Sequence, residues 1–358
     1  MAKRVVIVGG GIIGAAAAYR LARAGADVLV IDAGVGTATV ASFGWLNASF
    51  YLSEAHFRLR VEGLAAYRRL LAELDVPVRF CGCLSTEHQG AALRAEARRL
   101  GAMGYDARVI DGPAFARLEP AVAPPDEALH FPGEGIAEPA ELARALMTAA
   151  IGRGARVLAG LRADRLMAEG GRIAGVVTPA GPVRADEVLV AAGTGTEALL
   201  ATADLPLPMV PRPAYVVESH PVAPVLTHVL ATPEGELRQR PDGVLVMPAA
   251  VSHQGDSAEA VSMTPEAAAE ATTQRIRALL PGVALDWAQV RLAHRPMPAD
   301  GLPAVGRLAP GLTVAVMHSG MTLAAITGEC LAREVLDGPS NATEALLADF
   351  RPERFAAT

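Results

Sequence analysis

Three glycines and one aspartate near the N-terminus have the types and spacing needed to hold a dinucleotide. Gly9, Gly11 and Gly14 follow the pattern G-x-G-x-x-G, and Asp32 follows Gly9 by 23 residues. The first glycine permits a tight turn, the second lets a pyrophosphate approach the backbone, and the third lets a helix pack against the preceding strand. An acid at this distance binds a ribose hydroxyl and repels a 2′-phosphate, which disfavours NADP.

The surrounding elements must present these residues at the edge of a sheet. Residues 5–8 are continuously apolar and predict a buried parallel strand, residues 15–24 predict a small-residue helix, and residues 27–31 predict a second strand. The helix N-terminus would offer N–H groups and a positive dipole end to phosphates. A glycine-rich turn without a ligand is the alternative, but this complete strand–helix–strand unit favours dinucleotide binding.

Two later segments repeat the pattern of a buried strand that ends in a small-residue turn. Residues 188–192 run into Gly193-Thr194-Gly195, and residues 312–317 run into a tight loop over residues 318–322, followed by a helix over 323–336. Ligands collect at the carboxyl ends of such strands in open α/β sheets. We therefore predict an α/β fold, with one discontinuous nucleotide-binding domain and one inserted sheet domain.

The predicted division of the chain follows the proline-punctuated, antiparallel segments. The nucleotide-binding domain is expected over residues 1–78, 138–212 and 291–358, and the substrate domain over residues 79–137 and 213–290. Further expected elements are helices over 54–74, 90–104, 140–153 and 264–280, strands over 76–86, 214–218 and 228–248, and a proline-rich crossing segment over 118–132.

Composition excludes several classes of function. The 358 residues carry a net charge of −6, and no basic stripe is interleaved with aromatics, so we expect no nucleic-acid partner. We expect no signal peptide and no transmembrane segment, because the first strand starts at residue 4 and no apolar run reaches about 18 residues. Three cysteines fit a reducing, cytoplasmic setting. Cys81 and Cys83 share one face of a predicted strand without a second ligand pair, so no metal site is expected.

The ordered segments together resemble the D-amino-acid oxidase-like family of FAD enzymes, near glycine oxidase and sarcosine oxidase. The resemblance extends over nearly the whole chain. Its segments are residues 5–25, the pairs Ala41-Ser42 and Asn47-Ala48, and residues 138–157, 185–196, 294–306 and 318–336. It implies a discontinuous, Rossmann-like FAD-binding domain of the GR2 type and an inserted antiparallel-sheet α+β substrate domain.

The same resemblance implies non-covalent FAD. Sarcosine oxidases that tether FAD use a cysteine near the block at 291–298; none is present there, and Cys330 lies inside the final predicted helix. The residues that the resemblance places around FAD are Gly9, Gly11, Gly14, Asp32, Ser42, Asn47, Ala163, Ala192, Gly193, Ser319, Gly320, Met321 and Thr322.

The implied reaction is oxidation of a C–N bond of an amino acid or secondary amine by hydride transfer to flavin N5. Arg295 matches the family's carboxylate-binding arginine, and an ion pair with Asp300 is the structural alternative. His318, and secondly His294, would hydrogen-bond flavin or substrate unless they only pack. Further residues expected near the pocket, for which packing is an equal or better interpretation, are Trp45, Tyr51, Tyr215, Arg238, Arg240 and His253.

One departure from the family bears on the electron acceptor. Sarcosine oxidases activate oxygen with a lysine near flavin N5, whereas Lys3 is the only lysine in this chain and begins the first strand. Oxygen or another carrier is therefore left open as the acceptor, and a dehydrogenase is the main competing hypothesis to an oxidase. Three more hypotheses stay open: a flavoprotein subunit that acts with a partner, oxidation of a carrier-bound or pathway-specific intermediate, and an NAD-dependent enzyme. The substrate itself is expected to be a small molecule.

Overall fold

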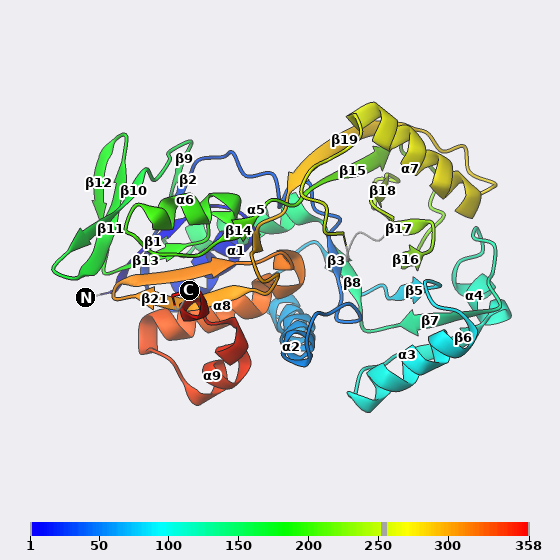
Figure 1. Ribbon diagram of the computed structural model, residues 1–358, viewed down its shortest axis with the longest axis horizontal. Helices are drawn as coiled ribbons and strands as arrows, with labels where there is room; N and C mark the ends of the chain where they lie inside the picture. The colour runs from blue at the N-terminus through cyan, green and yellow to red at the C-terminus, as the bar shows by residue number, and fades with distance from the viewer. Residues whose placement is uncertain (1, 252–255, 357–358) are drawn as a thin grey trace.

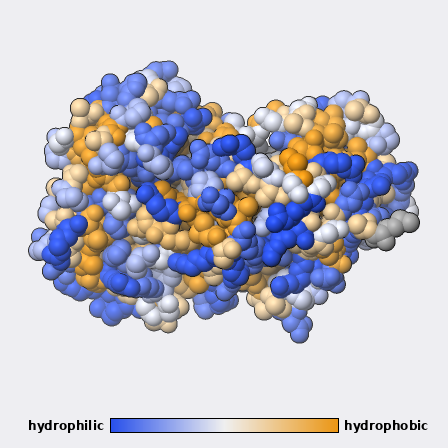
Figure 2. All heavy atoms as spheres, turned by 180° about the vertical axis from the view of Figure 1, so that it is seen from behind, coloured by the Kyte–Doolittle hydropathy of each residue, from blue (hydrophilic) through white to orange (hydrophobic). Residues whose placement is uncertain are grey.

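The computed structural model describes residues 2–251 and 256–356, and these form two lobes, each built around one large sheet (Figure 1). Seen from behind, the outline narrows between the lobes, and hydrophobic and hydrophilic residues are interspersed over this face (Figure 2). None of the helices in the described ranges is long and apolar enough to cross a membrane.

The first lobe contains a six-stranded sheet drawn from distant parts of the chain. Five neighbouring strands pair in parallel, and the sixth, at one edge of the sheet, pairs antiparallel to its neighbour. In spatial order, the strands are β21 (Ala304–Ala309), β22 (Leu312–Val316), β13 (Glu187–Val190), β1 (Arg4–Val8), β2 (Asp27–Asp32) and β9 (Arg156–Ala159). The glycine-turn segments at the start, middle and end of the chain therefore lie side by side.

Alternating side chains of β1 enter two different cores, as expected for a strand covered on both faces. Val5 and Ile7 belong to a core that includes the four long helices of this lobe, whereas Val6 and Val8 belong to a core on the opposite face. The four helices are α1 (Ile12–Arg23), α2 (Glu54–Leu71), α5 (Pro139–Ile151) and α8 (Gly320–Asp337). The opposite face is covered by α6 (Thr196–Ala201) and a sheet of β10 (Arg165–Glu169), β11 (Arg172–Thr178) and β12 (Gly181–Arg184).

The second lobe contains an eight-stranded sheet, in which all neighbours pair antiparallel except the parallel pair β16–β5. Its order is β19 (Trp287–His294), β15 (Pro213–Ser219), β18 (Leu245–Pro248), β17 (Gly235–Gln239), β16 (Val229–Thr232), β5 (Cys83–Ser85), β7 (Glu127–Phe131) and β6 (Arg108–Asp111). Its helices are α3 (Gly90–Ala102), α4 (Gly112–Leu118) and α7 (Pro265–Leu279). As predicted, Thr264 caps α7, because its side chain accepts from the N–H of Ala267.

Short elements join the lobes. A three-stranded sheet has the order β3 (Trp45–Leu46), β8 (Gly135–Ala137) and β4 (Val78–Arg79), and β14 (Met209–Val210) pairs with β20 (Met297–Pro298). The C-terminal part adds α9 (Asn341–Leu347) and the 3-10 turns η2 (Ala348–Phe350) and η3 (Pro352–Phe355), while η1 (Gly193–Gly195) follows β13.

Three local expectations were wrong. Residues 76–86 are two short strands in different sheets, β4 and β5, and Cys81 lies between them rather than on a strand with Cys83. The crossing segment over 118–132 contains the strand β7. This strand is stabilised by pairing with β5 and β6, and its local sequence does not indicate a strand. The final helix begins at Gly320, so residues 320–322 form its first turn rather than a loop.

Candidate functional site

A cavity lies where the two lobes meet. Its wall combines the segment after β2, the N-terminal end of α8, one arginine of α2 and the edge of the eight-stranded sheet. The lining residues are Ala38, Ala41, Ser42, Phe43, Gly44, Trp45, Arg60, Val216, Ala293, Arg295, Pro296, His318, Ser319, Met321 and Thr322. Of the residues predicted to form the site, this cavity brings together Ser42, Arg295, His318, Ser319, Met321 and Thr322.

The β1–α1 turn requires glycine for steric reasons. Gly9 has φ +109°, and a Cβ there would lie 2.3 Å from the carbonyl oxygen of Ala191. A Cβ at Gly14 would lie 1.9 Å from the carbonyl oxygen of Gly9, so only glycine lets α1 start this close to the strand. At Gly11, the nearest atom to an added Cβ is Thr39 Oγ1 at 3.2 Å. The crowding therefore falls on the first and third glycines of the motif.

Asp32 lies beside this turn at the end of β2. A Cβ at Gly10 would lie 2.6 Å from Asp32 Oδ2, and Asp32 Oδ1 accepts from the N–H of Gly34 at 3.3 Å. Gly11 is the N-cap of α1 and makes no side-chain cap, while the N–H of Ile12 donates to Thr39 Oγ1 at 3.1 Å. The first turn of α1 and a carboxylate thus face one edge of the sheet.

The N-terminal end of α8 meets that of α1. Gly320 packs against Ile12 and Ile13, since a Cβ at Gly320 would lie 3.6–3.7 Å from their side chains. The N-cap Ser319 makes no side-chain cap to its own helix, because its Oγ accepts from Arg60 Nη1 at 2.6 Å. Two helix N-termini, each with a positive dipole end and neither with a side-chain cap to its own helix, therefore converge on one region.

Arg60 is a buried arginine on the apolar face of α2. Its side chain is 1% exposed, and its Nε donates to the carbonyl oxygen of Asn47 at 3.0 Å, while Nη2 donates to Asn47 Oδ1. Burial lowers the pKa of Arg60 to about 10, which leaves the guanidinium protonated at neutral pH. A positive charge therefore forms part of the cavity wall.

The segment from Trp45 to Ser49 is held from its other side by a buried carboxylate. Glu134 accepts from the N–H groups of Ala48 at 3.1 Å and Ser49 at 2.9 Å, from Trp45 Nε1 at 3.0 Å and from the hydroxyl of Tyr105 at 2.7 Å. Burial raises the pKa of Glu134. Arg60 and Glu134 thus fix this backbone between them, with only part of the segment reaching the cavity.

Asn47 lies behind the cavity wall. It is fully buried, its N–H donates to Thr322 Oγ1 at 3.3 Å, and its Nδ2 has no hydrogen-bond partner within the described ranges. Thr322 Oγ1 also donates to the carbonyl oxygen of Trp45 at 3.4 Å. Asn47 therefore joins α2, α8 and the segment after β2.

Arg295 follows β19 and enters the cavity from the second lobe. It is 6% exposed, its Nε donates to the carbonyl oxygen of Arg212 at 3.0 Å, and its Nη2 pairs with Asp256 Oδ2 at 2.6 Å. Asp300 instead pairs with Arg354 at 2.7 Å. The structural alternative of an Arg295–Asp300 ion pair is therefore wrong, because a different carboxylate reaches this arginine.

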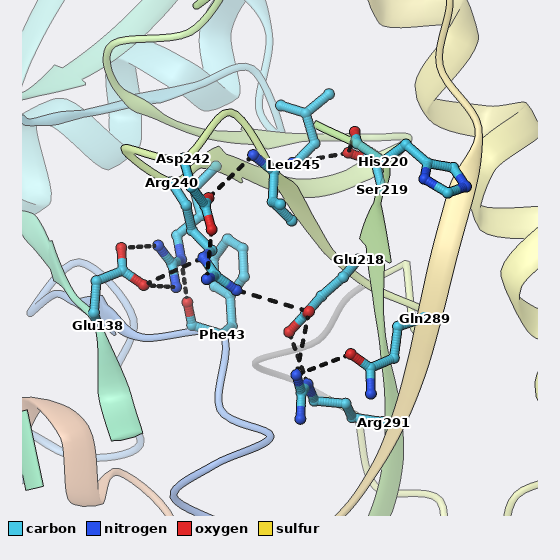
Figure 3. Close-up of polar contacts among 12 residues, drawn as sticks. Phe43, Glu138, Glu218, Ser219, His220, Arg240, Asp242, Leu245, Gln289 and Arg291 are labelled. Carbon is cyan, nitrogen blue, oxygen red and sulfur yellow. Dashed lines mark hydrogen bonds and ion pairs between the residues drawn. The ribbon is translucent and has the colours of Figure 1, made fainter. Parts of the chain in front are cut away.

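An ionic network continues along the same face of the eight-stranded sheet (Figure 3). Arg238 pairs with Glu138 at 2.8 Å and donates to the carbonyl oxygen of Phe43. Glu218 lies 3.7 Å from Arg240 Nη1 and 2.8 Å from Arg291 Nε. Arg238 and Arg240, predicted to lie on strands that roof the pocket, thus both form ion pairs, and the hydrogen bond from Arg238 to Phe43 ties the sheet to the cavity-lining segment.

The remaining predicted residues lie around these groups. Ala192 and Gly193 follow β13, and Ala192 Cα would lie 3.1 Å from a Cβ at Gly9. Ala163 packs against the core on the far face of the six-stranded sheet. His294 is exposed, with its N–H bonded to Thr37 Oγ1.

Three predicted aromatic or imidazole residues are not placed in the cavity wall. Tyr51 donates to Met103 Sδ at 3.4 Å and does not line the cavity. Tyr215 lies next to Val216 on β15 and therefore faces the other side of the sheet. His253 lies outside the described residues.

We did not predict Arg60, Glu134 or Asp256 from the sequence. A signal for Arg60 was available, because it lies three residues after Phe57 and four before Leu64, on the apolar stripe of a predicted helix. A charged residue inside such a stripe is rarely buried without a reason. No comparable local pattern marks Glu134 or Asp256.

Comparisons with known proteins agree on one family. A model described as FAD dependent oxidoreductase (DAO) matches residues 4–334. A D-amino acid dehydrogenase of Cereibacter sphaeroides is 27% identical, covering 99% of this chain and 96% of that protein.

Among solved structures, iminodiacetate oxidase from Chelativorans sp. BNC1 has a TM-score of 0.83 at 26% identity, covering 98% of this chain and 99% of its own. Glycine oxidase from Geobacillus kaustophilus has a TM-score of 0.83 at 24% identity, covering 98% of both chains.

Proposed function

Because the chain belongs to the DAO family of FAD-dependent oxidoreductases, we propose that it oxidises the C–N bond of a carboxylate-bearing amino acid or secondary amine. The family expected from the sequence is confirmed, as is its mixed α/β fold with parallel and antiparallel sheets. The same match identifies an amine or amino-acid oxidoreductase and favours FAD over the NAD-dependent hypothesis.

The residues of the cavity and the neighbouring β1–α1 turn fit FAD. The turn has no room for side chains at Gly9 or Gly14, and α1 and α8, whose N-cap residues make no side-chain cap, direct their N-termini toward one region. Such helix ends favour phosphates and other negative charge. When bound, FAD would supply the acceptor for the hydride of the C–N bond, at flavin N5.

We assign the cofactor contacts as expected from the family resemblance. The pyrophosphate would lie against Gly9, Gly11 and Gly14, a ribose against Asp32, and the adenine and ribose side near Ala163, Ala192 and Gly193. The ring would lie in the cavity against Ser42 and the residues of the α8 N-terminus, Ser319, Gly320, Met321 and Thr322, with Asn47 supporting from behind. No cysteine lines the cavity, which supports non-covalent binding.

Arg295 would bind the substrate carboxylate. Its guanidinium lines the cavity next to Ala293 and Pro296, and a guanidinium can take a carboxylate in a two-pronged hydrogen-bonded geometry that orients the neighbouring carbon. In the structure Asp256 forms an ion pair with Nη2 of Arg295, so a substrate carboxylate would compete with Asp256 for this guanidinium. His318 also lines the cavity wall and would contact the ring or the substrate.

We propose that electrons leave mainly to an acceptor other than oxygen. Lys3 Nζ donates to the carbonyl oxygen of Val335 and lies 3.9 Å from Glu187, at the end of β1 opposite the glycine turn. No lysine therefore reaches the cavity to activate oxygen in the manner implied for sarcosine oxidases. The D-amino acid dehydrogenase among the relatives supports this choice.

The domain division predicted from the sequence is compatible with a cavity between an FAD-binding and a substrate-binding domain. We propose that residues 1–78, 138–212 and 291–358 carry FAD, and that residues 79–137 and 213–290 carry most of the substrate wall. Arg295 and the end of β19, which continues the eight-stranded sheet to His294, would then join the two.

The test is anaerobic reduction of the FAD-loaded protein by a panel of D- and L-amino acids, glycine, and secondary amines with and without a carboxylate. We expect bleaching of the flavin spectrum only with carboxylated amines, followed by faster reoxidation with a quinone-type or phenazine dye than with oxygen. Protein that stays colourless when FAD is supplied would refute the proposal. Bleaching by amines irrespective of a carboxylate would refute the substrate assignment alone.

A further inference from the structure

Arg60 differs from the other buried arginines in the kind of partner it has. Three other arginines are buried in the described ranges, and each pairs with a carboxylate: Arg20 with Glu73 at 2.7 Å and Glu329 at 3.0 Å, Arg238 with Glu138 at 2.8 Å, and Arg295 with Asp256 at 2.6 Å.

Arg60 is bonded only to neutral groups in the part of the chain that is described. Its partners are the backbone and side-chain oxygens of Asn47 and the hydroxyl of Ser319. Glu134 acts on it only at longer range, and that carboxylate accepts hydrogen bonds from four other donors.

A buried charge without a directly bonded counter-charge is costly, so proteins retain one where another charge arrives. Arg60 lines the cavity beside Ser319, the residue that begins α8. The two helix N-termini nearby add positive potential of the same sign. The wall around Ser319 is therefore suited to a ligand that is, or becomes, negatively charged.

We propose that Arg60 compensates the negative charge that the flavin ring gains on reduction and so raises its reduction potential. This inference rests on the proposed binding of FAD in this cavity. A ring that takes two electrons and one proton bears one net negative charge, and a cation in a low-dielectric wall stabilises that state more than the neutral oxidised ring. Arg60 also orients Ser319 and Asn47 through hydrogen bonds, so it positions part of the cavity wall in addition to supplying a positive charge.

The substrate carboxylate is the competing counter-charge. Arg295 already offers a guanidinium to it from the opposite lobe, whereas Arg60 is held on the α2–α8 side by three hydrogen bonds. We therefore assign Arg60 to the ring and Arg295 to the substrate.

The experiment measures the two-electron reduction potential of the FAD-loaded protein, by equilibration with a reference dye, for the wild type and for Arg60→Gln. We expect Arg60→Gln to reduce the preference for reduced over oxidised FAD at least tenfold, a fall of about 30 mV or more. Arg20→Gln is the matched control, because it removes another buried guanidinium that does not line the cavity. Its potential should equal that of the wild type.

A second variant guards against misfolding. Arg60→Lys keeps one charge, and a lysine buried here loses its proton at a lower pH than arginine. Its potential should match that of the wild type at pH 6 and lie about 30 mV or more below it at pH 9. A potential for Arg60→Lys at pH 6 that falls as far below the wild type as that of Arg60→Gln would overturn the inference, because the charge is still present there.

The outcomes separate this inference from the proposed function. Protein that binds no FAD refutes the function, and the inference with it. Arg60→Gln protein that binds FAD with an unchanged potential overturns only the inference. An unchanged potential together with a raised KM for the amine substrate would assign Arg60 to the substrate instead.

Discussion

At the scale of single residues, the site depends on how each buried charge is partnered. Arg295 and Asp256 form a close, mostly buried pair in the cavity wall, with side-chain exposures of 7% and 16%. A substrate carboxylate must displace or share this partner. The strength of substrate binding therefore reflects a difference between two ion pairs rather than one contact.

Removing Arg295 and removing Asp256 should change the KM for carboxylated amines in opposite directions. Arg295→Ala should raise KM for carboxylated amines by at least tenfold, because the carboxylate loses its guanidinium. Asp256→Asn should lower KM by about fivefold, corresponding to ~1 kcal/mol for a partly buried ion pair. Steady-state kinetics with a dye acceptor measures both.

Asp300→Asn is the control, since Asp300 pairs with Arg354 outside the cavity wall, and it should leave KM unchanged. A KM for Asp256→Asn above that of the wild type would show that Asp256 assists substrate binding rather than competing with it.

His56 should make the fold sensitive to acid. It is 2% exposed, and burial, followed by the charge of Arg60, lowers its pKa from 6.5 to about 3. Between pH 6.5 and about 3 the unfolded chain binds a proton that the folded chain rejects, so the free energy of unfolding falls as the pH falls. The slope from this group approaches about 1.4 kcal/mol per pH unit.

Urea unfolding of wild type and His56→Gln from pH 7 to pH 4.5 checks this assignment. The variant should lose most of that added slope relative to the wild type, whereas the exposed His220→Gln should retain it. Parallel pH profiles for wild type and His56→Gln would contradict the depressed pKa.

At the scale of elements, the close approach of α2 to α8 sets the position of the α8 N-terminus. A Cβ at Gly63 would lie 2.5 Å from the carbonyl oxygen of Thr322, and the hydroxyl of Tyr67 donates to the carbonyl oxygen of Met321 at 2.6 Å. The packing of these two helices therefore acts directly on two residues of the cavity wall.

Gly63→Ala should separate the helices. We expect a loss of about 1–3 kcal/mol in the free energy of unfolding, as for an overpacked core position, and weaker binding of FAD. Gly101→Ala in α3 is a matched control, because a Cβ there meets nothing within 4 Å, and it should stabilise the protein by about 0.5–1 kcal/mol. Chemical denaturation and fluorescence titration with FAD give both quantities, and equal FAD affinity in Gly63→Ala and wild type would argue against this coupling.

At the scale of the whole molecule, the cofactor should stabilise a lobe assembled from distant segments. The β1–α1 turn, the end of β13 and the N-terminus of α8 lie together only in the folded sheet. A ligand bound across them and absent from the unfolded chain adds RT ln(1 + [L]/Kd), about 2.7 kcal/mol at 100 times Kd. FAD should therefore raise Tm by several degrees, increasing with its concentration.

Scanning calorimetry of FAD-free protein with added FAD, NAD⁺ or NADP⁺ tests this expectation. Neither nicotinamide cofactor should shift Tm at concentrations where FAD does. A shift by NAD⁺ equal to that by FAD would contradict the assignment of the cofactor.

The local sequence by itself determined the features that depend on short-range rules. The apolar strand, the glycine turn and the small-residue helix over the first 32 residues lie as predicted, because Gly9 and Gly14 meet backbone atoms that leave no room for a Cβ. The glycine turn after β13 and the helix after β22 were found in the same way. β5 was predicted only as part of one longer strand over residues 76–86, and β7 was not recognised, since such short strands depend on partners elsewhere in the chain.

Only the tertiary structure decided which groups the buried arginines meet. Arg60 and Ser319 are 259 residues apart, Arg295 and Asp256 are 39 apart, and no local pattern relates either pair. The residue type indicates that a buried guanidinium needs an anionic partner, but only the fold determines which group lies within hydrogen-bonding distance of it. The partners of Arg295 and of Arg60 therefore belong to the packing of α2, α8 and β19 rather than to any motif.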